Sequence, residues 1–254
     1  MKALILAAGY ATRLRPLTDT WAKELLPVGG RPIIDRIVDA IGLVDEVDQV
    51  HVVTNARKAP AFRTWAEGRD VVLHDDGTTS NDDRLGAIGD MAFVVEQAQI
   101  DDHLLVIAGD NLFDFSIADL VAFWREKGVA SAVAVRDVGS LELAAQYGVV
   151  DLAADGRMLS FVEKPAHPAA SLAATATYLY HREHVKLIRP YLDDGNPGDQ
   201  PGRFAAWLQS REPVYGWVFD EQWYDIGNRE QLLEADNRLR AEAGLPQRDV
   251  YSPD

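Results

Sequence analysis

The sequence predicts an α/β fold, and three observations support this class. Short apolar runs alternate with helical patterns through the first half of the chain, which is the order of βαβ units. Loops with glycine or aspartate follow two of these runs, where open parallel sheets bind ligands. The 254 residues, 47% of them hydrophobic, are enough to bury about 70% of the unfolded surface in one domain. We expect a Rossmann-like, three-layer fold with a mixed, mostly parallel central sheet.

The elements of the first half follow from hydrophobic periodicity. Arg31–Ile41 carries its apolar side chains on one helical face. A second helix is expected after the capping-box-like pair Ser116 and Asp119, where apolar residues again recur at helical spacing. Strands are expected at Lys2–Ala8, Gln49–Thr54, Asp70–His74, His103–Ala108 and Val129–Val135.

The second half is richer in β-structure. Tyr147–Leu152 and Met158–Lys164 flank an Asp-Gly turn, a pattern that predicts a hairpin. An exposed loop is expected at Pro190–Arg203, because Asp, Gly and Pro are frequent there. Two more strands and a closing amphipathic helix are expected at Thr175–His181, Val214–Phe219 and Asn228–Ala243. We therefore expect a small β-rich subdomain beside the α/β core.

The composition excludes several classes of protein. The formal net charge of -15 argues against a nucleic-acid or anionic-membrane partner, since both need a basic face. The chain has no cysteine and therefore neither disulfides nor thiolate metal sites. Its apolar runs are too short to span a bilayer, and its N-terminus enters a strand without the features of a signal peptide. We expect a cytoplasmic protein.

The loop after the first strand has the composition of a phosphate cradle. Gly9 allows a close approach of the backbone, Thr12 supplies a hydroxyl, and Arg13 and Lys23 supply cations that offset phosphate charge. The Walker pattern is absent, and the dinucleotide pattern G-x-G-x-x-G fails because alanine and leucine stand where glycines are needed. The alternative is an ordinary βα loop in which both cations are merely solvated.

Two aspartates that follow apolar segments are candidate Mg²⁺ ligands. Asp110 comes directly after the apolar run His103–Ala108 and one glycine, and Asp225 lies within Trp223–Asn228. Mg²⁺ typically takes one or two carboxylates and fills its other positions with phosphate oxygens and water. The alternatives are a turn aspartate for Asp110 and a loop or helix-capping aspartate for Asp225.

Several segments together resemble the signature of the sugar-1-phosphate nucleotidyltransferases, a family that includes glucose-1-phosphate thymidylyltransferases and uridylyltransferases. The matching segments occur in the family's order across about the whole chain: Leu6–Thr18 with Lys23–Val28, Gly109-Asp110, Glu163-Lys164-Pro165 and Trp223–Gly227. Ala11 replaces the family's usual second glycine, and Ala22 replaces a usual proline. Neither departure removes a catalytic group.

The resemblance implies a role for each matched residue. The catalytic cations would be Arg13, Lys23 and Lys164, and the Mg²⁺ ligands would be Asp110 and Asp225. The nucleotide would contact Leu6, Ala8, Gly9, Thr12, Arg13, Thr79, Arg84 and Gly86. The sugar phosphate would contact Asn111, Tyr147, Gly148, Glu163, Lys164 and Thr175. The alternatives are a mobile polar loop at Asp75–Asp83 and a solvated strand end at Glu163-Lys164.

The activity implied by the resemblance is transfer of a nucleotidyl group from a nucleoside triphosphate, with dTTP or UTP favoured, to a sugar 1-phosphate. Mg²⁺ would be the cofactor, and a homo-oligomer is possible. A cytidylyltransferase acting on a sugar or polyol phosphate and a non-catalytic nucleotide-sugar-sensing subunit remain alternatives. We expect one nucleotidyltransferase domain over 1–254, with a nucleotide-binding core at 1–135, a mainly sugar-phosphate-binding part at 136–227, and a C-terminal helix and tail at 228–254.

Overall fold

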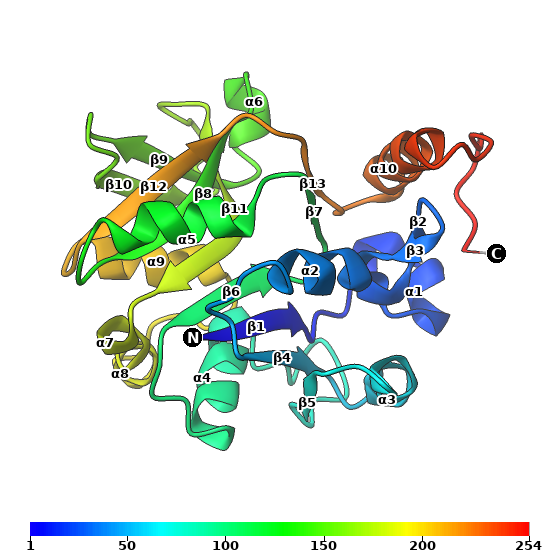
Figure 1. Ribbon diagram of the computed structural model, residues 1–254, viewed down its shortest axis with the longest axis horizontal. Coiled ribbons are helices and arrows are strands. Elements are labelled where there is room, and N and C mark those ends of the chain that lie inside the picture. The colour runs from blue at the N-terminus through cyan, green and yellow to red at the C-terminus, as the bar shows by residue number, and fades with distance from the viewer. Residues whose placement is uncertain (254) are drawn as a thin grey trace.

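The computed structural model describes residues 1–253 and has a nine-stranded mixed sheet at its centre (Figure 1). Its main path runs in the order β10 (Met158–Glu163), β9 (Gly148–Leu152), β11 (Leu172–Tyr180), β6 (Leu104–Ala108), β1 (Lys2–Ala7), β4 (Gln49–Thr54) and β5 (Val72–Asp75). Off this path, β8 (Ser131–Asp137) pairs with β11 and with β12 (Val214–Phe219).

The four strands β5, β4, β1 and β6 are parallel, so their carboxyl ends share one edge of the sheet. β1 lies between β4 and β6, the point at which the strand order reverses and ligands bind in such sheets. The backbone N–H of Gly109 donates to the carbonyl of Leu6 at 2.8 Å. A Cβ on Gly109 would lie 2.8 Å from that same oxygen, so only glycine lets the two strand ends approach this closely.

β11 joins the parallel half of the sheet to the β-rich half. It is antiparallel to β6, β8 and β9, and β9 forms the predicted hairpin with β10. The register between β11 and β8 shifts between Ala174 and Tyr178, where Ala176 has a φ of 52°, as in a β-bulge. The β-rich part is therefore a continuation of the central sheet.

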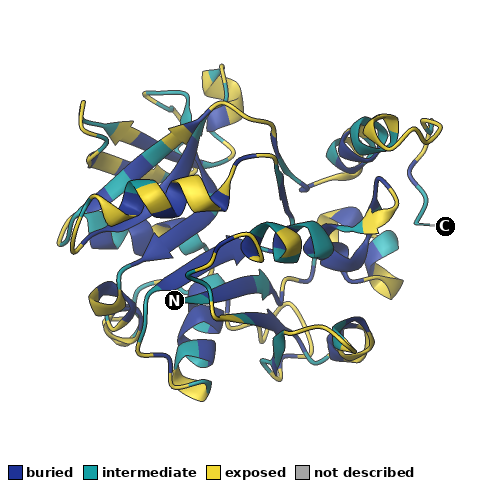
Figure 2. Cartoon of the chain, in the orientation of Figure 1, coloured by how far each residue is buried: buried dark blue, intermediate teal, exposed yellow. Residues whose placement is uncertain are grey.

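Two hydrophobic clusters cover the two faces of the sheet. One packs α2 (Ile33–Ile41) and α5 (Ile117–Arg125) against the face that carries Ala3 and Ile5. The other packs α4 (Ala87–Gln97), α8 (Ile188–Asp193) and α9 (Pro201–Gln209) against the face that carries Leu4. Alternate residues of β1 thus point to opposite layers, as strand geometry requires. Figure 2 shows buried strands beneath helices with exposed outer faces, which confirms the predicted three-layer α/β fold.

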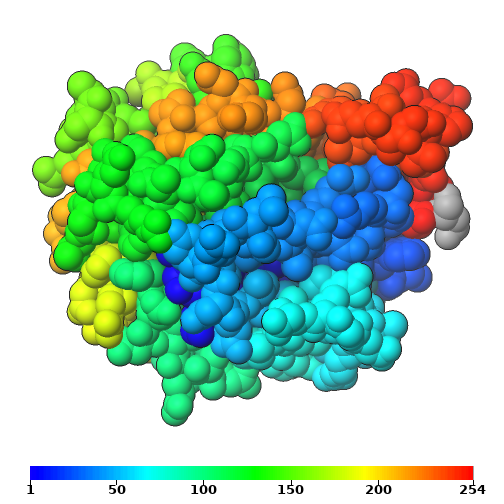
Figure 3. All heavy atoms as spheres, viewed as in Figure 1, coloured from blue at the N-terminus to red at the C-terminus, as the bar shows by residue number. Residues whose placement is uncertain are grey.

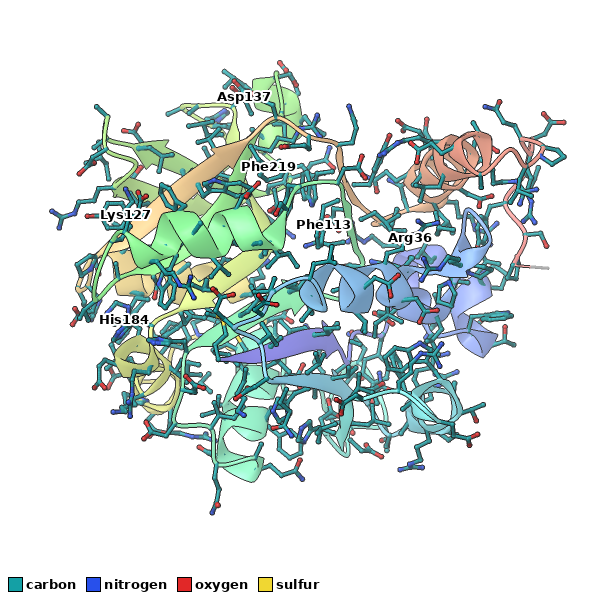
Figure 4. All side chains as sticks on the ribbon, viewed as in Figure 1. Arg36, Phe113, Lys127, Asp137, His184 and Phe219 are labelled. Atoms are coloured by element: carbon teal, nitrogen blue, oxygen red, sulfur yellow. The ribbon has the colours of Figure 1, made fainter. Side chains whose placement is uncertain are left out.

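A separate two-stranded sheet brings together two distant parts of the chain. β7 (Asn111–Phe113) is antiparallel to β13 (Trp223–Asp225), with Asp225 opposite Asn111. The ring of Phe115 lies 4.3 Å from that of Phe113 and 4.4 Å from that of Phe219, so aromatic packing ties β7 to β12. Figure 4 labels Phe113 and Phe219 on these neighbouring segments. Three-residue strands carry too little periodicity for a sequence to predict them.

The prediction of an exposed loop at Pro190–Arg203 is wrong at both ends. α8 continues through Asp193, and α9 begins at Pro201, because proline is favoured in the first turn of a helix.

The remaining elements are short: 3-10 turns η1 (Thr12–Leu14) and η2 (Lys23–Leu25), helices α1 (Leu17–Thr20), α3 (Ala59–Ala66), α6 (Leu141–Ala144) and α7 (Arg182–Val185), and the hairpin β2 (Pro27–Val28) and β3 (Arg31–Pro32).

The predicted closing helix is present as α10 (Arg229–Glu242), and it packs on the β2–β3 hairpin. The N–H of Gly29 donates to Asp236 Oδ1 at 2.8 Å, and the hydroxyl of Tyr251 donates to the carbonyl of Pro27 at 2.9 Å. Figure 3 shows the C-terminal segment lying against the N-terminal one. No helix among residues 1–253 has the length and apolar character needed to cross a membrane.

Candidate active site

The cradle loop leaves β1 through Gly9 and turns sharply at Ala11. Nothing lies within 4 Å of a Cβ built on Gly9, so the backbone there is open to a ligand. Ala11 has a φ of 44°, a left-handed conformation that glycine adopts without strain. The Thr18 hydroxyl donates to the Ala11 carbonyl at 2.9 Å, and the Tyr10 hydroxyl lies 3.0 Å from that of Thr78. These bonds hold the loop in a fixed shape.

Lys23 and Asp110 form the charged centre of the site. Lys23 Nζ lies 2.5 Å from Asp110 Oδ2, and the lysine is only 8% exposed. Burial disfavours the ammonium, but the charges of Asp110 and Asp225 outweigh it and raise the pKa of Lys23. Lys23 therefore remains a cation and offsets the two carboxylates.

Asp225 is brought next to Asp110 by the β7–β13 pairing. Burial, followed by the negative charge of Asp110, raises the pKa of Asp225 to about 6. The last helix does not need Asp225 as its cap, because Asn228 Oδ1 accepts from the Gln231 N–H at 2.9 Å. The helix-capping alternative for Asp225 is thus wrong, and the remaining explanation is a carboxylate held close to a second carboxylate.

This pair of carboxylates suits a divalent cation. Each carboxylate is destabilised by the other, and a bound cation would relieve that repulsion. No group of three or more His, Cys, Asp or Glu side chains among residues 1–253 is placed to hold a metal ion. Two carboxylates alone fit Mg²⁺, which leaves several positions to phosphate oxygens and water.

A cavity of about 330 Å³, here called the hairpin cavity, opens beside the carboxylates. Arg13 and Lys164 line it, and neither side chain has a hydrogen bond or ion pair with another residue in the described part of the chain. The predicted site residues that line it are Arg13, Asp110, Asn111, Tyr147, Gly148, Glu163, Lys164, Thr175 and Asp225. A phosphate placed here would meet two available cations.

Glu163 occupies a slot between two glycines. A Cβ on Gly148 would lie 3.1 Å from Glu163 Oε2 and 2.5 Å from the Phe161 ring, and one on Gly202 would lie 2.1 Å from Glu163 Oε2. Burial raises the pKa of Glu163. Gly202 belongs to the first turn of α9, so a segment predicted to be a loop supplies one wall of this cavity.

The side chains of Asn111 and Thr175 form hydrogen bonds with other residues of the protein. Asn111 Nδ2 donates to the Thr175 carbonyl at 2.6 Å, and Asn111 Oδ1 accepts from Trp223 Nε1 at 3.3 Å. The Thr175 hydroxyl donates to the carbonyl of Ala134 at 3.0 Å. Both side chains therefore shape the cavity wall and hold β7 against β11 and β13.

A second cavity of about 190 Å³, here called the cradle cavity, lies on the other side of Asp110. Its lining residues are Leu6, Ala8, Gly9, Glu24, Arg84, Gly86, Ala87, Asp90, Ala108, Asp110, Asp199 and Pro201. Four residues line both cavities: Ala108, Asp110, Asp199 and Pro201. The two cavities therefore meet, and Asp110 stands at their junction.

Three of the residues predicted to contact the nucleotide either line neither cavity or are already bonded within the protein. Thr12, an exposed residue of η1, and Thr79 line neither cavity. The Thr79 N–H and hydroxyl each donate to Asp83 Oδ2 at 3.0 Å. Arg84 lines the cradle cavity, but its guanidinium is bonded to Asp199.

Two buried carboxyls of the cradle cavity had no signal in the sequence. Burial raises the pKa of Glu24 to about 7, and burial together with the charge of Asp76 raises that of Asp90 to about 8. Glu24 adjoins a motif lysine, and Asp90 falls in the first turn of α4. Acidic residues at such positions are usually solvated, so only the packing reveals that these two are buried.

A larger cavity of about 420 Å³ lies away from this site, along α2 and the amino ends of β4 and β5. Its arginines are engaged by its own carboxylates, Arg31 with Asp39 and Arg69 with Asp35. No predicted site residue lines it. Volume alone therefore does not identify the functional site, and the groups around Asp110 do.

The comparison with protein families agrees with this geometry. A family model described as "Nucleotidyl transferase" matches residues 2–242, which is nearly the whole chain. The chain belongs to the nucleotidyl transferase family. The family resemblance predicted from the sequence is confirmed.

Relatives of this nucleotidyl transferase include a UTP--glucose-1-phosphate uridylyltransferase of Synechocystis sp., 29% identical over 239 residues that cover 89% of the chain and 60% of that protein. The Bifunctional protein GlmU of Methanocaldococcus jannaschii is 28% identical over 94% of the chain and 54% of that protein. A glucose-1-phosphate thymidylyltransferase of Streptomyces antibioticus is 28% identical over 94% of the chain and 66% of that protein. The chain thus spans about 54–66% of the length of these relatives.

A solved structure shares the fold. The putative glucose-1-phosphate thymidylyltransferase of Bacillus anthracis, in complex with sucrose, superposes with a TM-score of 0.80 at 24% identity. The match covers 94% of this chain and 95% of that one. The nucleotidyl transferase fold therefore extends over nearly the whole molecule.

Proposed function

We propose that this nucleotidyl transferase moves a nucleotidyl group from a nucleoside triphosphate, with dTTP or UTP favoured, to a sugar 1-phosphate. The observation that carries the proposal is the junction of two cavities at Asp110. On one side of it lie Arg13 and Lys164, whose side chains bond to no other residue among 1–253, and beside it lies the pair of carboxylates. The names of the uridylyl- and thymidylyltransferase relatives support the choice of substrates.

In this proposal the cradle cavity holds the nucleotide. Leu6, Ala8 and Gly86 would pack against the base and sugar, and the backbone at Gly9 would approach the phosphates. Thr12, Thr79 and Arg84 would act from the loops around that cavity. The 1–135 segment would thus form the nucleotide-binding core, and 136–227 would supply most of the acceptor side.

The hairpin cavity would hold the sugar 1-phosphate. Glu163 would accept hydrogen bonds from sugar hydroxyls, Gly148 would let the backbone approach the ring, and Tyr147 would close the cavity wall. Lys164 and Arg13 would neutralise the phosphate as charge-assisted donors. Asn111 and Thr175 would keep this wall in shape through their internal hydrogen bonds.

The reaction would be an in-line displacement at the α-phosphorus. An oxygen of the sugar phosphate forms the new bond to phosphorus, the bond to the β-phosphate oxygen breaks, and pyrophosphate leaves with that electron pair. The nucleophile is already an anion, so no general base is required. Arg13, Lys23 and Lys164 would align the phosphates and offset their charge, which is the main source of rate enhancement in such reactions.

Asp110 and Asp225 would hold Mg²⁺, which neutralises phosphate charge when bound. Lys23 would maintain the position of Asp110 through their 2.5 Å contact.

Pyrophosphate release tests the proposal. The purified chain would be mixed with Mg²⁺, each of four nucleoside triphosphates in turn, and a small panel of sugar 1-phosphates. We expect release with dTTP or UTP that depends on the acceptor. Release with CTP alone would favour the cytidylyltransferase alternative, and binding without release across the panel would favour the sensing subunit.

A further inference from the structure

Arg84 and Asp199 form a bidentate ion pair where the two cavities meet. Arg84 Nε donates to Asp199 Oδ1 at 3.2 Å, and Arg84 Nη2 donates to Asp199 Oδ2 at 3.1 Å. Arg84 Nη1 donates to the carbonyl of Asn81. Three of the five N–H donors of this guanidinium are thus in hydrogen bonds, and two of them hold the Asp199 carboxylate in a fixed orientation.

The backbone fixes the position of Asp199 as firmly as the ion pair does. The Ala87 N–H donates to the Asp199 carbonyl at 3.2 Å, and the Ile88 N–H donates to the Gly198 carbonyl at 2.7 Å. A Cβ on Gly86 would lie 2.7 Å from Asp199 Cα and 2.6 Å from the Gly198 oxygen. The first turn of α4 and the segment before α9 are therefore in direct contact, and these backbone contacts hold Asp199 in place.

The carboxylate of Asp199 remains available to a ligand. Its side chain is 55% exposed, and the residue lines the hairpin cavity together with Gln200, Pro201 and Gly202. The hydrogen bonds from Arg84 lower the pKa of Asp199, with help from the charges of Arg84 and Lys164. Each oxygen uses one lone pair on Arg84 and keeps one free, so an ionised Asp199 can accept further hydrogen bonds.

The chemistry of the two ligands decides which of them this carboxylate serves. The phosphates of a triphosphate would be repelled by a carboxylate in contact with them, so Asp199 suits a ligand group that donates a hydrogen bond, such as a sugar hydroxyl. Asp199 lines both cavities, but its neighbours Gln200 and Gly202 line the hairpin cavity alone, which favours a donor on the acceptor. Glu163 Oε2 lies at the position that a Cβ of Gly202 would fill, so a second carboxylate faces the same wall. The wall formed by Asp199 and Glu163 therefore carries two carboxyl groups, and Lys164 is the cation of this cavity whose charge acts on both of them.

We propose that Asp199 is a specificity-determining residue of the hairpin cavity and that Arg84 is its positioning residue. Asp199 accepts a hydrogen bond from a hydroxyl or amino group of the acceptor sugar, away from the 1-phosphate. It also repels acceptors that carry a carboxylate at that end. This inference rests on the proposed function, because it names the group that selects among acceptors at the same site.

Steady-state kinetics of the full chain test this assignment, with glucose 1-phosphate, glucosamine 1-phosphate and glucuronic acid 1-phosphate as acceptors. In Asp199→Asn we expect the KM for glucose 1-phosphate to rise roughly 10-fold, since a hydrogen bond to a charged group is lost. The KM for the triphosphate should change less than about twofold, because the acceptor contact alone is altered. The preference for the neutral or amino sugar over the uronic acid should shrink.

Two further variants sharpen the test. Arg84→Gln should raise the KM for glucose 1-phosphate in the same direction and by less, because Asp199 loses its orientation and keeps its charge. Asp194→Asn is the matched control, since it removes an exposed carboxylate from the same segment that lines neither cavity. Its kinetic constants should equal those of the unchanged chain.

Three results would overturn the assignment: acceptor constants in Asp199→Asn equal to those of the control, a rise confined to the KM for the triphosphate, or a lowered thermal midpoint with unchanged acceptor preference. Calorimetric titration with glucose 1-phosphate separates this assignment from the proposed function. Weaker binding by Asp199→Asn supports Asp199 even if no triphosphate is turned over, and equal binding contradicts it.

Discussion

The two cavities that meet at Asp110 are lined by different kinds of residue. The hairpin cavity carries two cations, Arg13 and Lys164, whose side chains have no partner in the described part of the chain, while Arg84 of the cradle cavity is bonded to Asp199. The cradle cavity is otherwise lined mainly by small or apolar residues and by two buried carboxyls. Charge neutralisation is thus concentrated at the junction and on the hairpin side, and the cradle side depends on shape and backbone groups.

This difference explains why one cavity was easier to foresee. A cation in a loop that follows a strand leaves a visible signal in a sequence, whereas a wall of backbone groups and small side chains does not. All six residues predicted to contact the sugar phosphate line the hairpin cavity. Of the residues predicted to contact the nucleotide, Thr12 and Thr79 line neither cavity. Variants of residues in the two cavities test whether the contrast is functional.

The largest effect is expected at the junction. Asp225→Asn should lower Mg²⁺-dependent turnover by roughly 10³-fold, because one of two metal-binding carboxylates is lost. The same variant should be more stable than the unchanged chain above pH 6 without metal. The raised pKa of Asp225, about 6, means that its ionisation destabilises the folded state as pH rises through that value.

Initial rates and thermal midpoints measured over a pH series check both expectations. Asp220→Asn, at an exposed carboxylate five residues earlier, is the control. Near-normal rates in Asp225→Asn would mean that the carboxylate pair does not bind the metal.

The next effect tests the unpaired cations of the hairpin cavity. Arg13→Ala should reduce turnover by roughly 10²–10³-fold, because a donor aimed at developing phosphate charge is removed. Its thermal midpoint should stay close to the original, since Arg13 makes no hydrogen bond or ion pair with another described residue. Arg15→Ala, which removes an exposed arginine that pairs with Asp19, is the comparison variant. Unchanged turnover in Arg13→Ala would take this residue out of the site.

A smaller effect concerns the buried carboxyls of the cradle cavity. The folded-state pKa of Asp90, about 8, lies above its ordinary value of 3.8, so the folded state holds this proton more tightly than the unfolded state does. The stabilisation is present below pH 4 and is lost as pH rises towards 8. Relative to Asp90→Asn, the free energy of unfolding of the unchanged chain should fall across that range. Urea titrations at several pH values measure it, and parallel pH profiles for the two proteins would contradict it.

The smallest effect is expected in the cradle loop. Ala11→Gly relieves the left-handed strain at φ 44° and adds some unfolded-state entropy. The net gain should be roughly 0.5–1 kcal/mol in the free energy of unfolding, with turnover kept. Ala8→Gly, at the residue directly after β1, which is not among those with a positive φ, should instead lose stability. A loss in both variants would show that the Ala11 conformation carries no strain.

The sequence predicted the parts of the fold that depend on long periodic segments. The apolar runs at β1, β4, β6 and β12 are long enough to show their pattern, and each forms a strand. The β7–β13 pair escaped prediction, because strands of three residues have no measurable period. α9 was not predicted because its opening Pro201 and Gly202 resemble a loop, although proline starts helices and Gly202 makes room for Glu163.

The same physical reason limits what could be foreseen of the site. Asp110, Lys164 and Asp225 are charged residues at strand ends, and Arg13 and Lys23 lie in the loop after the first strand. The structure brings all five together around the junction. Glu24 and Asp199 gain their character from neighbours distant in sequence. Glu24 is buried by packing near Gly109, and Asp199 is held by an arginine 115 residues away. Such properties belong to the tertiary structure.

The central claim is that the two cavities form one active site, in which the triphosphate reacts with the sugar 1-phosphate. The most direct test is whether release of pyrophosphate from the triphosphate requires the sugar 1-phosphate. With Mg²⁺ and dTTP or UTP, the account predicts no release without acceptor and, when acceptor is present, one pyrophosphate for each nucleotide sugar formed. Release at the same rate without acceptor, or no release with any triphosphate and acceptor, would contradict it.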